Sequence, residues 1–126
     1  MLLDSHALLW WILDHPSLSP QAREAISGTE NEVLISAASA WEIAIKFQAG
    51  RLPEAGDLVS NFRSEIEHEG FQFLPISAEH GIRAGLLPSL HKDPFDRMLV
   101  AQSQAEDLPI FSNETIFDAY GVRRLW

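Results

Sequence analysis

The chain has 126 residues, and its 46% hydrophobic and 21% charged residues form a globular balance with no signature of disorder or of a fibrous repeat. It contains no cysteine, which excludes a disulfide scaffold and a zinc site made of thiolates, and which fits a cytoplasmic protein. Nine Lys and Arg against 18 Asp and Glu give a net charge of −9, which opposes unspecific binding to a polyanion such as nucleic acid.

The N-terminal stretch is the most apolar part of the chain. Residues 1–3 predict a brief strand that ends at Asp4, and residues 6–13 carry apolar side chains at the spacing of a helix that Ser5 can cap. Polar residues interrupt the stretch, which is also shorter than the ~20 residues of a membrane span. Because no basic segment precedes it, we expect neither a signal peptide nor an anchor, and a protein that stays in the cytoplasm.

The middle of the chain alternates helix and strand signals. A helix begins at Ser19, because a capping serine followed by proline is a helix-start signal. Residues 33–35 form a short apolar run typical of a buried parallel strand. A helix over 37–49 follows, with Ser36 as its cap and Gly50 as its left-handed stop.

The second half continues the alternation. Leu58, Phe62 and Ile66 recur every four residues before a glycine and predict one long helix. The remaining elements are a strand over 71–76, helices over 78–86 and 94–106 with a loop at 91–94, a strand over 108–111 and an edge strand over 122–125. This order predicts an α/β fold with a short, mainly parallel central sheet covered on both faces, since each parallel pair needs a long crossover. With no linker or repeat, we expect one domain over residues 1–126.

Acidic residues follow the carboxyl ends of the predicted strands, which is where sites lie in open α/β sheets. Asp4 ends the first strand, and Glu42 lies about two turns into the helix that leaves the second. Asp93 and Asp96 begin a later helix, and Glu114 follows the last buried strand. Carboxylates gathered at one edge repel one another, and a bound Mg²⁺ or Mn²⁺ ion relieves that repulsion while it activates water. The set therefore predicts hydrolysis of a phosphodiester.

Each acid also has a structural interpretation, which the residues alone leave open. Asp93 before a proline is a good helix cap, and Asp4 can cap the first helix. Glu42 can pair with Lys46 one turn later. Glu114 stands in a polar turn after a strand, where a solvated acid is ordinary.

The histidines do not change this interpretation. The five histidines are His6, His15, His68, His80 and His91. No two of them have the spacing of metal ligands on a helix, which argues against a zinc site. His6 and His91 lie nearest the acids in sequence, and surface or capping roles explain both. A phosphotransferase of the haloacid-dehalogenase kind would need a second aspartate two residues after Asp4, where His6 stands, which argues against that class.

Three motifs and a C-terminal segment resemble a known family. They are LLDSHALLW at residues 2–10, SAASAWEIAIK at 36–46, HKDPFDRMLVAQ at 91–102 and FDAYGV at 117–122. In this order and from end to end, they resemble the PIN-domain ribonuclease toxins of the VapC type. The resemblance implies a PIN-like three-layer α/β/α domain, cleavage of RNA with Mg²⁺ or Mn²⁺, a cognate antitoxin in a bacterial toxin–antitoxin pair, and a homodimer.

The resemblance also implies roles for individual residues. The implied catalytic residues, of which the first three bind metal, are Asp4, Asp96, Glu42 and Glu114. Asp93 matches a second aspartate common in the subgroup, and Ser112 matches a small hydroxyl residue that orients a water or a carboxylate. Glu114 stands where aspartate is more usual, and its longer arm suits contact with the metal directly or through water.

We therefore expect a divalent-metal-dependent endoribonuclease that is the toxin of a toxin–antitoxin pair; the alternative is a non-catalytic PIN-fold module that acts through its antitoxin complex. An antitoxin with a basic, apolar tail would suit the net charge of −9 and an aromatic surface near Trp10 or Trp11, although core packing explains both tryptophans as well. The RNA target stays open. So does contact between RNA and any of four cationic residues, Lys46, Arg97, Arg123 and Arg124.

Overall fold

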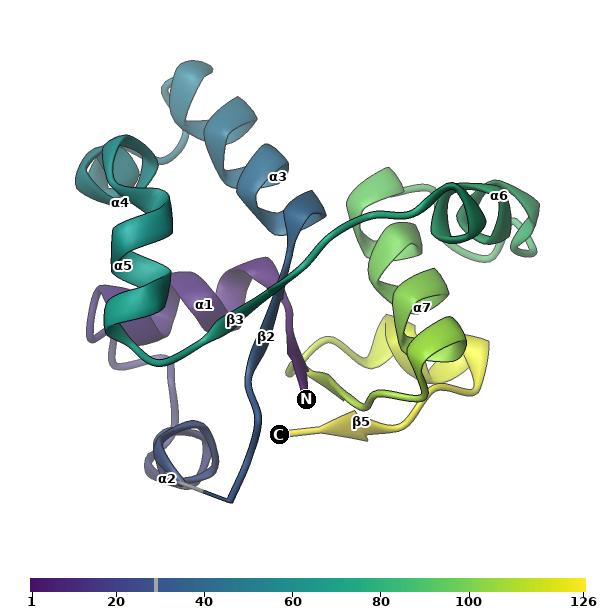
Figure 1. Cartoon of the computed structure of the whole chain (residues 1–126), viewed down its shortest axis with the longest axis horizontal. Coiled ribbons are helices and arrows are strands. Elements are labelled where there is room, and N and C mark those ends of the chain that lie inside the picture. The colour runs from purple at the N-terminus through teal and green to yellow at the C-terminus, as the bar shows by residue number, and fades with distance from the viewer. Residues whose placement is uncertain (29) are drawn as a thin grey trace.

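A five-stranded parallel sheet lies at the centre of the computed structural model, which describes residues 1–28 and 30–126 (Figure 1). The strand order is β3-β2-β1-β4-β5, and every neighbouring pair is parallel. The strands are β1 (Leu2–Leu3), β2 (Leu34–Ser36), β3 (Gln72–Leu74), β4 (Ile110–Phe111) and β5 (Arg124–Leu125). The predicted α/β class, the parallel sheet and the edge position of the last strand are confirmed.

The two residues of β1 build two separate cores. Leu2 and Leu3 point to opposite faces of the sheet, because side chains alternate along a strand. Leu3 packs in the first core with residues of the helices α1 (Ser5–Ile12), α2 (Pro20–Ser27), α3 (Ala37–Gln48), α4 (Gly56–Ser60) and α5 (Phe62–His68). Leu2 packs in the second core with residues of the helix α7 (Pro94–Glu106) and the 3₁₀ helix η2 (Thr115–Tyr120).

The helices cover both faces of the sheet and give a three-layer α/β/α arrangement. Figure 1 shows α1, α4 and α5 on one side of the strands and α7 on the other, with α6 (Ala78–Leu86) beyond it. A further 3₁₀ helix, η1 (Pro53–Ala55), leads from α3 into α4. The three-layer fold is thus confirmed. Within the described part of the chain, no helix combines the length and the apolar character that a membrane crossing requires.

The predicted long helix through residues 58–66 is wrong, because the chain forms two short helices that break at Asn61. Asn61 leaves the helical region, with φ −128° and ψ 32°, and its side-chain amide donates to the carbonyl of Asp57 at 3.1 Å. Such a local bond competes with the backbone ladder of a helix. The four-residue spacing correctly indicated buried positions, because Leu58 and Ile66, from the two helices, pack in the same core.

Local start and stop signals place several other helices correctly. Ser19 caps α2 and Ser36 caps α3 through bonds from the backbone N–H groups of the following turn. Gly50 adopts φ +76°, a left-handed conformation that favours glycine, just after α3. The strand β2 has the predicted length one residue later in the chain, whereas the other four strands are shorter than predicted. The central strand β1 offers only two residues for pairing on each side.

Candidate metal centre

Asp4 is a buried carboxylate at the carboxyl end of the central strand, with 3% of its surface exposed. Its Oδ1 accepts a hydrogen bond from the backbone N–H of Ala7 at 2.7 Å, so Asp4 is the cap of α1. Its Oδ2 accepts a bond from the hydroxyl of Ser112, which directly follows β4. The prediction that Ser5 caps α1 is therefore wrong, whereas the capping role that the sequence left open for Asp4 is confirmed. The first turn of α1 and the residue after β4 together fix the orientation of Asp4.

Ser5 instead holds a second acid. Its hydroxyl donates to Oε1 of Glu42 at 2.6 Å, and Nζ of Lys46 lies 2.7 Å from the other carboxylate oxygen. Glu42 lies on α3 and is 5% exposed, a depth at which an unpartnered carboxylate would be costly. The ion pair with Lys46 that the sequence left open is therefore present. Together with Ser5, it fixes both oxygens of Glu42.

Asp93 and Asp96 occupy the first turn of α7 and have different partners. Oδ1 of Asp93 accepts bonds from the backbone N–H groups of Phe95 and Asp96 at 2.9 and 3.0 Å, so its predicted capping geometry is confirmed. Oδ2 of Asp96 lies 2.8 Å from Nε2 of His91. Asp93 thus completes the helix start, while the Asp96 carboxylate is oriented by the loop before it.

The pKa of Asp96 shows that the acids sense one another. The pKa of Asp96 is raised to about 6, chiefly by burial, while the hydrogen bond with His91 opposes the rise. The charges of Asp93, Glu114 and Glu42 contribute to the same rise. Side chains from three separate segments therefore share one electrostatic environment.

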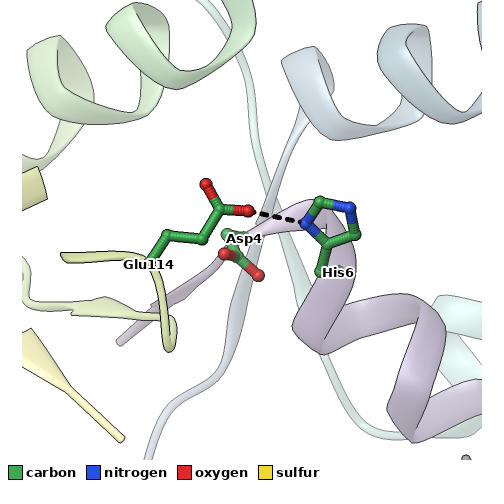
Figure 2. A group of neighbouring side chains, drawn as sticks. All are labelled: Asp4, His6 and Glu114. Atoms are coloured by element: carbon green, nitrogen blue, oxygen red, sulfur yellow. Dashed lines mark hydrogen bonds and ion pairs between the residues drawn. The ribbon is translucent and has the colours of Figure 1, made fainter. Parts of the chain in front are cut away.

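Glu114 stands at the N-terminal end of η2, and its backbone N–H donates to the hydroxyl of Ser112 at 2.9 Å. Its Oε1 lies 2.8 Å from Nδ1 of His6, which projects from the first turn of α1. Figure 2 shows Asp4, His6 and Glu114 turned toward a common point. One potential ligand atom from each of the three residues lies within 4.8 Å of the others. Both His6 and Glu114 are partly open to solvent.

These residues fit a divalent metal ion. Burial raises the pKa of Asp4, the hydrogen bonds from Ser112 and Ala7 oppose the rise, and the nearby charge of Glu114 adds to it. An acid that is costly to ionise in this position gains a favourable charged form when a cation binds beside it. Carboxylate oxygens are the ligands that Mg²⁺ and Mn²⁺ prefer.

The structure orders the predicted site residues differently from their expected grouping. Asp4 and Glu114 lie in one group with His6, whereas Glu42 and Asp96 each hold a separate basic partner. His6 was expected to have only a surface or capping role, and it lies exposed but paired with Glu114. The sequence did carry a signal that His6 lies near Asp4, because a residue two positions after a helix-capping aspartate lies in the first turn of the same helix.

The cations whose contact with RNA the sequence left open all have internal partners. Lys46 pairs with Glu42, and the Arg97 guanidinium donates to four backbone carbonyls around the end of α6 and the loop before α7. Arg123 pairs with Asp107, and Arg124 pairs with Asp118. Each of these four cations therefore has a local structural role, and their contact with RNA stays untested.

Comparisons with known proteins identify a family and a similar fold. The PIN domain family model matches residues 1–122. Ribonuclease VapC16 from Mycobacterium tuberculosis is 36% identical to this chain over 70 residues, which cover 52% of the chain and 48% of that relative, so the match spans about half the length of the relative. The crystal structure of VapBC2 from Rickettsia felis bound to a DNA fragment from their promoter has a similar fold. It gives a TM-score of 0.69 at 15% identity and covers 98% of this chain and 96% of that one.

Proposed function

The chain belongs to the PIN domain family, and on that premise we propose that it is a VapC-type endoribonuclease, the toxin of a toxin–antitoxin pair, which hydrolyses RNA phosphodiester bonds with Mg²⁺ or Mn²⁺. The observation that carries the proposal is the convergence of acids from three segments at the carboxyl edge of the sheet. The similarity to Ribonuclease VapC16 supports the choice of RNA as substrate.

The proposed metal ligands are Asp4, Glu42 and Asp96, with Glu114 in contact directly or through water. When bound, the ion supplies a Lewis acid for a phosphate oxygen and a source of hydroxide near neutral pH. Asp4 is held by Ser112 and can offer its remaining lone pairs outward. Glu114 is the most exposed of these acids, which suits it to accept a proton from the attacking water.

The residues around the acids keep them in place. Ser5 and Lys46 fix Glu42, and His91 orients Asp96. Acids held in place by neighbouring side chains suit a catalytic site, because preorganised ligands need little rearrangement as the reaction proceeds. The hydroxyl of Ser112 bonds both the carboxylate of Asp4 and the backbone N–H of Glu114, and it thereby links these two acids.

We also propose a cognate antitoxin, a homodimer, a cytoplasmic location and a single domain over residues 1–126. Trp10 and Trp11, considered above as an aromatic surface, pack against the first core. The exposed apolar side chains that can serve a partner instead include Trp41, Ile82 and Leu86, at 60%, 65% and 80% exposure. An antitoxin with a basic segment would complement the net charge of −9.

The test is cleavage of a fluorogenic RNA by the metal-loaded wild type and by Asp4→Asn. Asparagine caps a helix as well as aspartate, so the variant is expected to fold. We expect Asp4→Asn to lose activity by about 100-fold or more. Asp14→Asn is the matched control, because Asp14 is an exposed aspartate paired only with Arg23. Equal cleavage by the wild type and Asp4→Asn would overturn the proposal, and calorimetry that detects no Mg²⁺ or Mn²⁺ binding would favour the non-catalytic module.

A further inference from the structure

His6 is a nitrogen donor among the acids of the proposed site. Asp4 caps α1 and turns its carboxylate back over the first turn, and His6 stands in that same turn. The imidazole is 48% exposed and has its Nδ1 directed at Glu114, so it lies at the open side of the buried Asp4 (Figure 2). Its ring lies 5.9 Å from the ring of Trp10, which restricts where it can move.

The spacing of the three side chains matches the ligand shell of one ion. Two neighbouring ligand atoms, each about 2.1 Å from an octahedrally coordinated ion, lie about 3 Å from each other, and opposite ones about 4.2 Å. Nδ1 of His6 and Oε1 of Glu114 are 2.8 Å apart, and the group with Asp4 fits within 4.8 Å. The 2.8 Å pair has the spacing of neighbouring ligands, whereas the 4.8 Å limit lies above that of opposite ligands, so a shared centre requires that the three side chains draw closer together.

We propose that His6 is a metal ligand, and that its Nδ1, together with Asp4 and Glu114, gives the site a preference for transition-metal ions such as Mn²⁺ over Mg²⁺. The proposal rests on the proposed function, that of a metal-dependent ribonuclease, and makes Glu114 a direct ligand. Imidazole favours transition metals, whereas Mg²⁺ takes oxygen ligands. The nitrogen therefore changes the choice of ion, which a carboxylate in the place of His6 would not do.

A hydrogen bond alone would also explain the pairing of His6 with Glu114, and the two explanations predict different results. If His6 only orients Glu114, its removal weakens the binding of Mn²⁺ and Mg²⁺ to a similar extent. If His6 is a ligand, its removal weakens the binding of Mn²⁺ selectively, and nitrogen is lost from the coordination sphere of the ion.

The experiment loads the metal-free full chain with Mn²⁺ and records electron spin-echo envelope modulation, which detects ¹⁴N nuclei bound to the ion. The variants are His6→Ala and His6→Gln, with His68→Ala on α5 as a matched control for loss of an exposed helical histidine. Asp4→Asn reports whether the bound ion occupies the proposed site. Circular dichroism checks that each variant folds, and His6→Gln keeps a side chain of similar length in case His6→Ala does not.

We expect ¹⁴N modulation in the wild type and in His68→Ala and none in either His6 variant. The affinity for Mn²⁺ should fall by about 10-fold or more in His6→Ala, and the affinity for Mg²⁺ should fall less than about 2-fold. Asp4-dependent binding of Mn²⁺ without ¹⁴N modulation overturns the role of His6 and leaves the metal-dependent nuclease standing. Mn²⁺ binding that Asp4→Asn does not weaken overturns the metal site itself.

Discussion

Asp96 is an acid whose proton is bound more tightly in the folded chain than in water. Its pKa is raised from 3.8 to about 6, chiefly by burial. The stabilisation that this proton gives is therefore fully present below pH about 4 and is lost as the pH rises through about 6. At neutral pH the ionised carboxylate of Asp96 therefore lowers the stability of the fold, and a cation bound beside it would offset this cost.

We predict that Asp96→Asn stabilises the metal-free protein at neutral pH. Asparagine carries no charge to desolvate, so its advantage in the free energy of unfolding should grow between pH 4 and 6 and level off at about 1–3 kcal/mol. Urea unfolding in EDTA across this range measures the difference. Asp14→Asn is the control, because that side chain is 89% exposed. A difference between wild type and Asp96→Asn that does not change with pH would contradict the raised pKa.

At the scale of single elements, Asp93 at the start of α7 allows a structural role, helix capping, to be tested apart from a role in the proposed site. Asp93 accepts two backbone hydrogen bonds at the first turn of this helix. We predict that Asp93→Ala lowers the free energy of unfolding by about 1 kcal/mol, whereas Asp93→Ser keeps a capping oxygen and loses little. Thermal unfolding measures both variants.

Cleavage assays on the same pair of variants show whether capping is the whole role of Asp93. If it is, Asp93→Ser cleaves RNA nearly as fast as the wild type. A variant that is as stable as the wild type but inactive would show that the carboxylate of Asp93 itself acts in the site.

Elements whose signals are local could be predicted from the sequence, and those that depend on distant contacts could not. A serine cap, a proline in the first turn and a glycine stop act within a few residues, which is why α2, α3 and α7 begin where expected. The break at Asn61 is also local, but the regular apolar spacing around it concealed it. The 3₁₀ helix η2 has only 6 residues, too short a segment to give a clear periodic signal, and it was not predicted.

At the scale of the whole molecule, the site depends on pairings that no short stretch encodes. Alternating elements predicted a parallel sheet, and the rule for its carboxyl edge predicted which acids meet there. The distant partners of those acids were not predictable, because the Asp4 bond to Ser112 spans 108 positions and the Ser5 bond to Glu42 spans 37. The position of His6 in the first turn of α1 was readable from the sequence, but its pairing with Glu114, which also spans 108 positions, was not.

Because the site exists only in the folded chain, we predict that metal ions stabilise the whole domain. At a concentration 100 times the dissociation constant, an ion that binds only the folded state adds about 2.7 kcal/mol, which corresponds to roughly 10 °C in Tm for a domain of this size. Scanning calorimetry with Mn²⁺ and then with EDTA measures the rise and its reversal. The rise should be absent in Asp4→Asn, and an equal rise in that variant would place the bound ion elsewhere.

The central strand β1 is made well before one of its two neighbours in the sheet, β4, which follows it far along the chain. Asp4 therefore emerges from the ribosome long before Ser112 and Glu114, which hold it and complete its surroundings. A half-synthesised chain carries several of the acids but cannot bring the full set together. For the proposed nuclease, the metal site can therefore assemble only after the segment that follows β4 has been made.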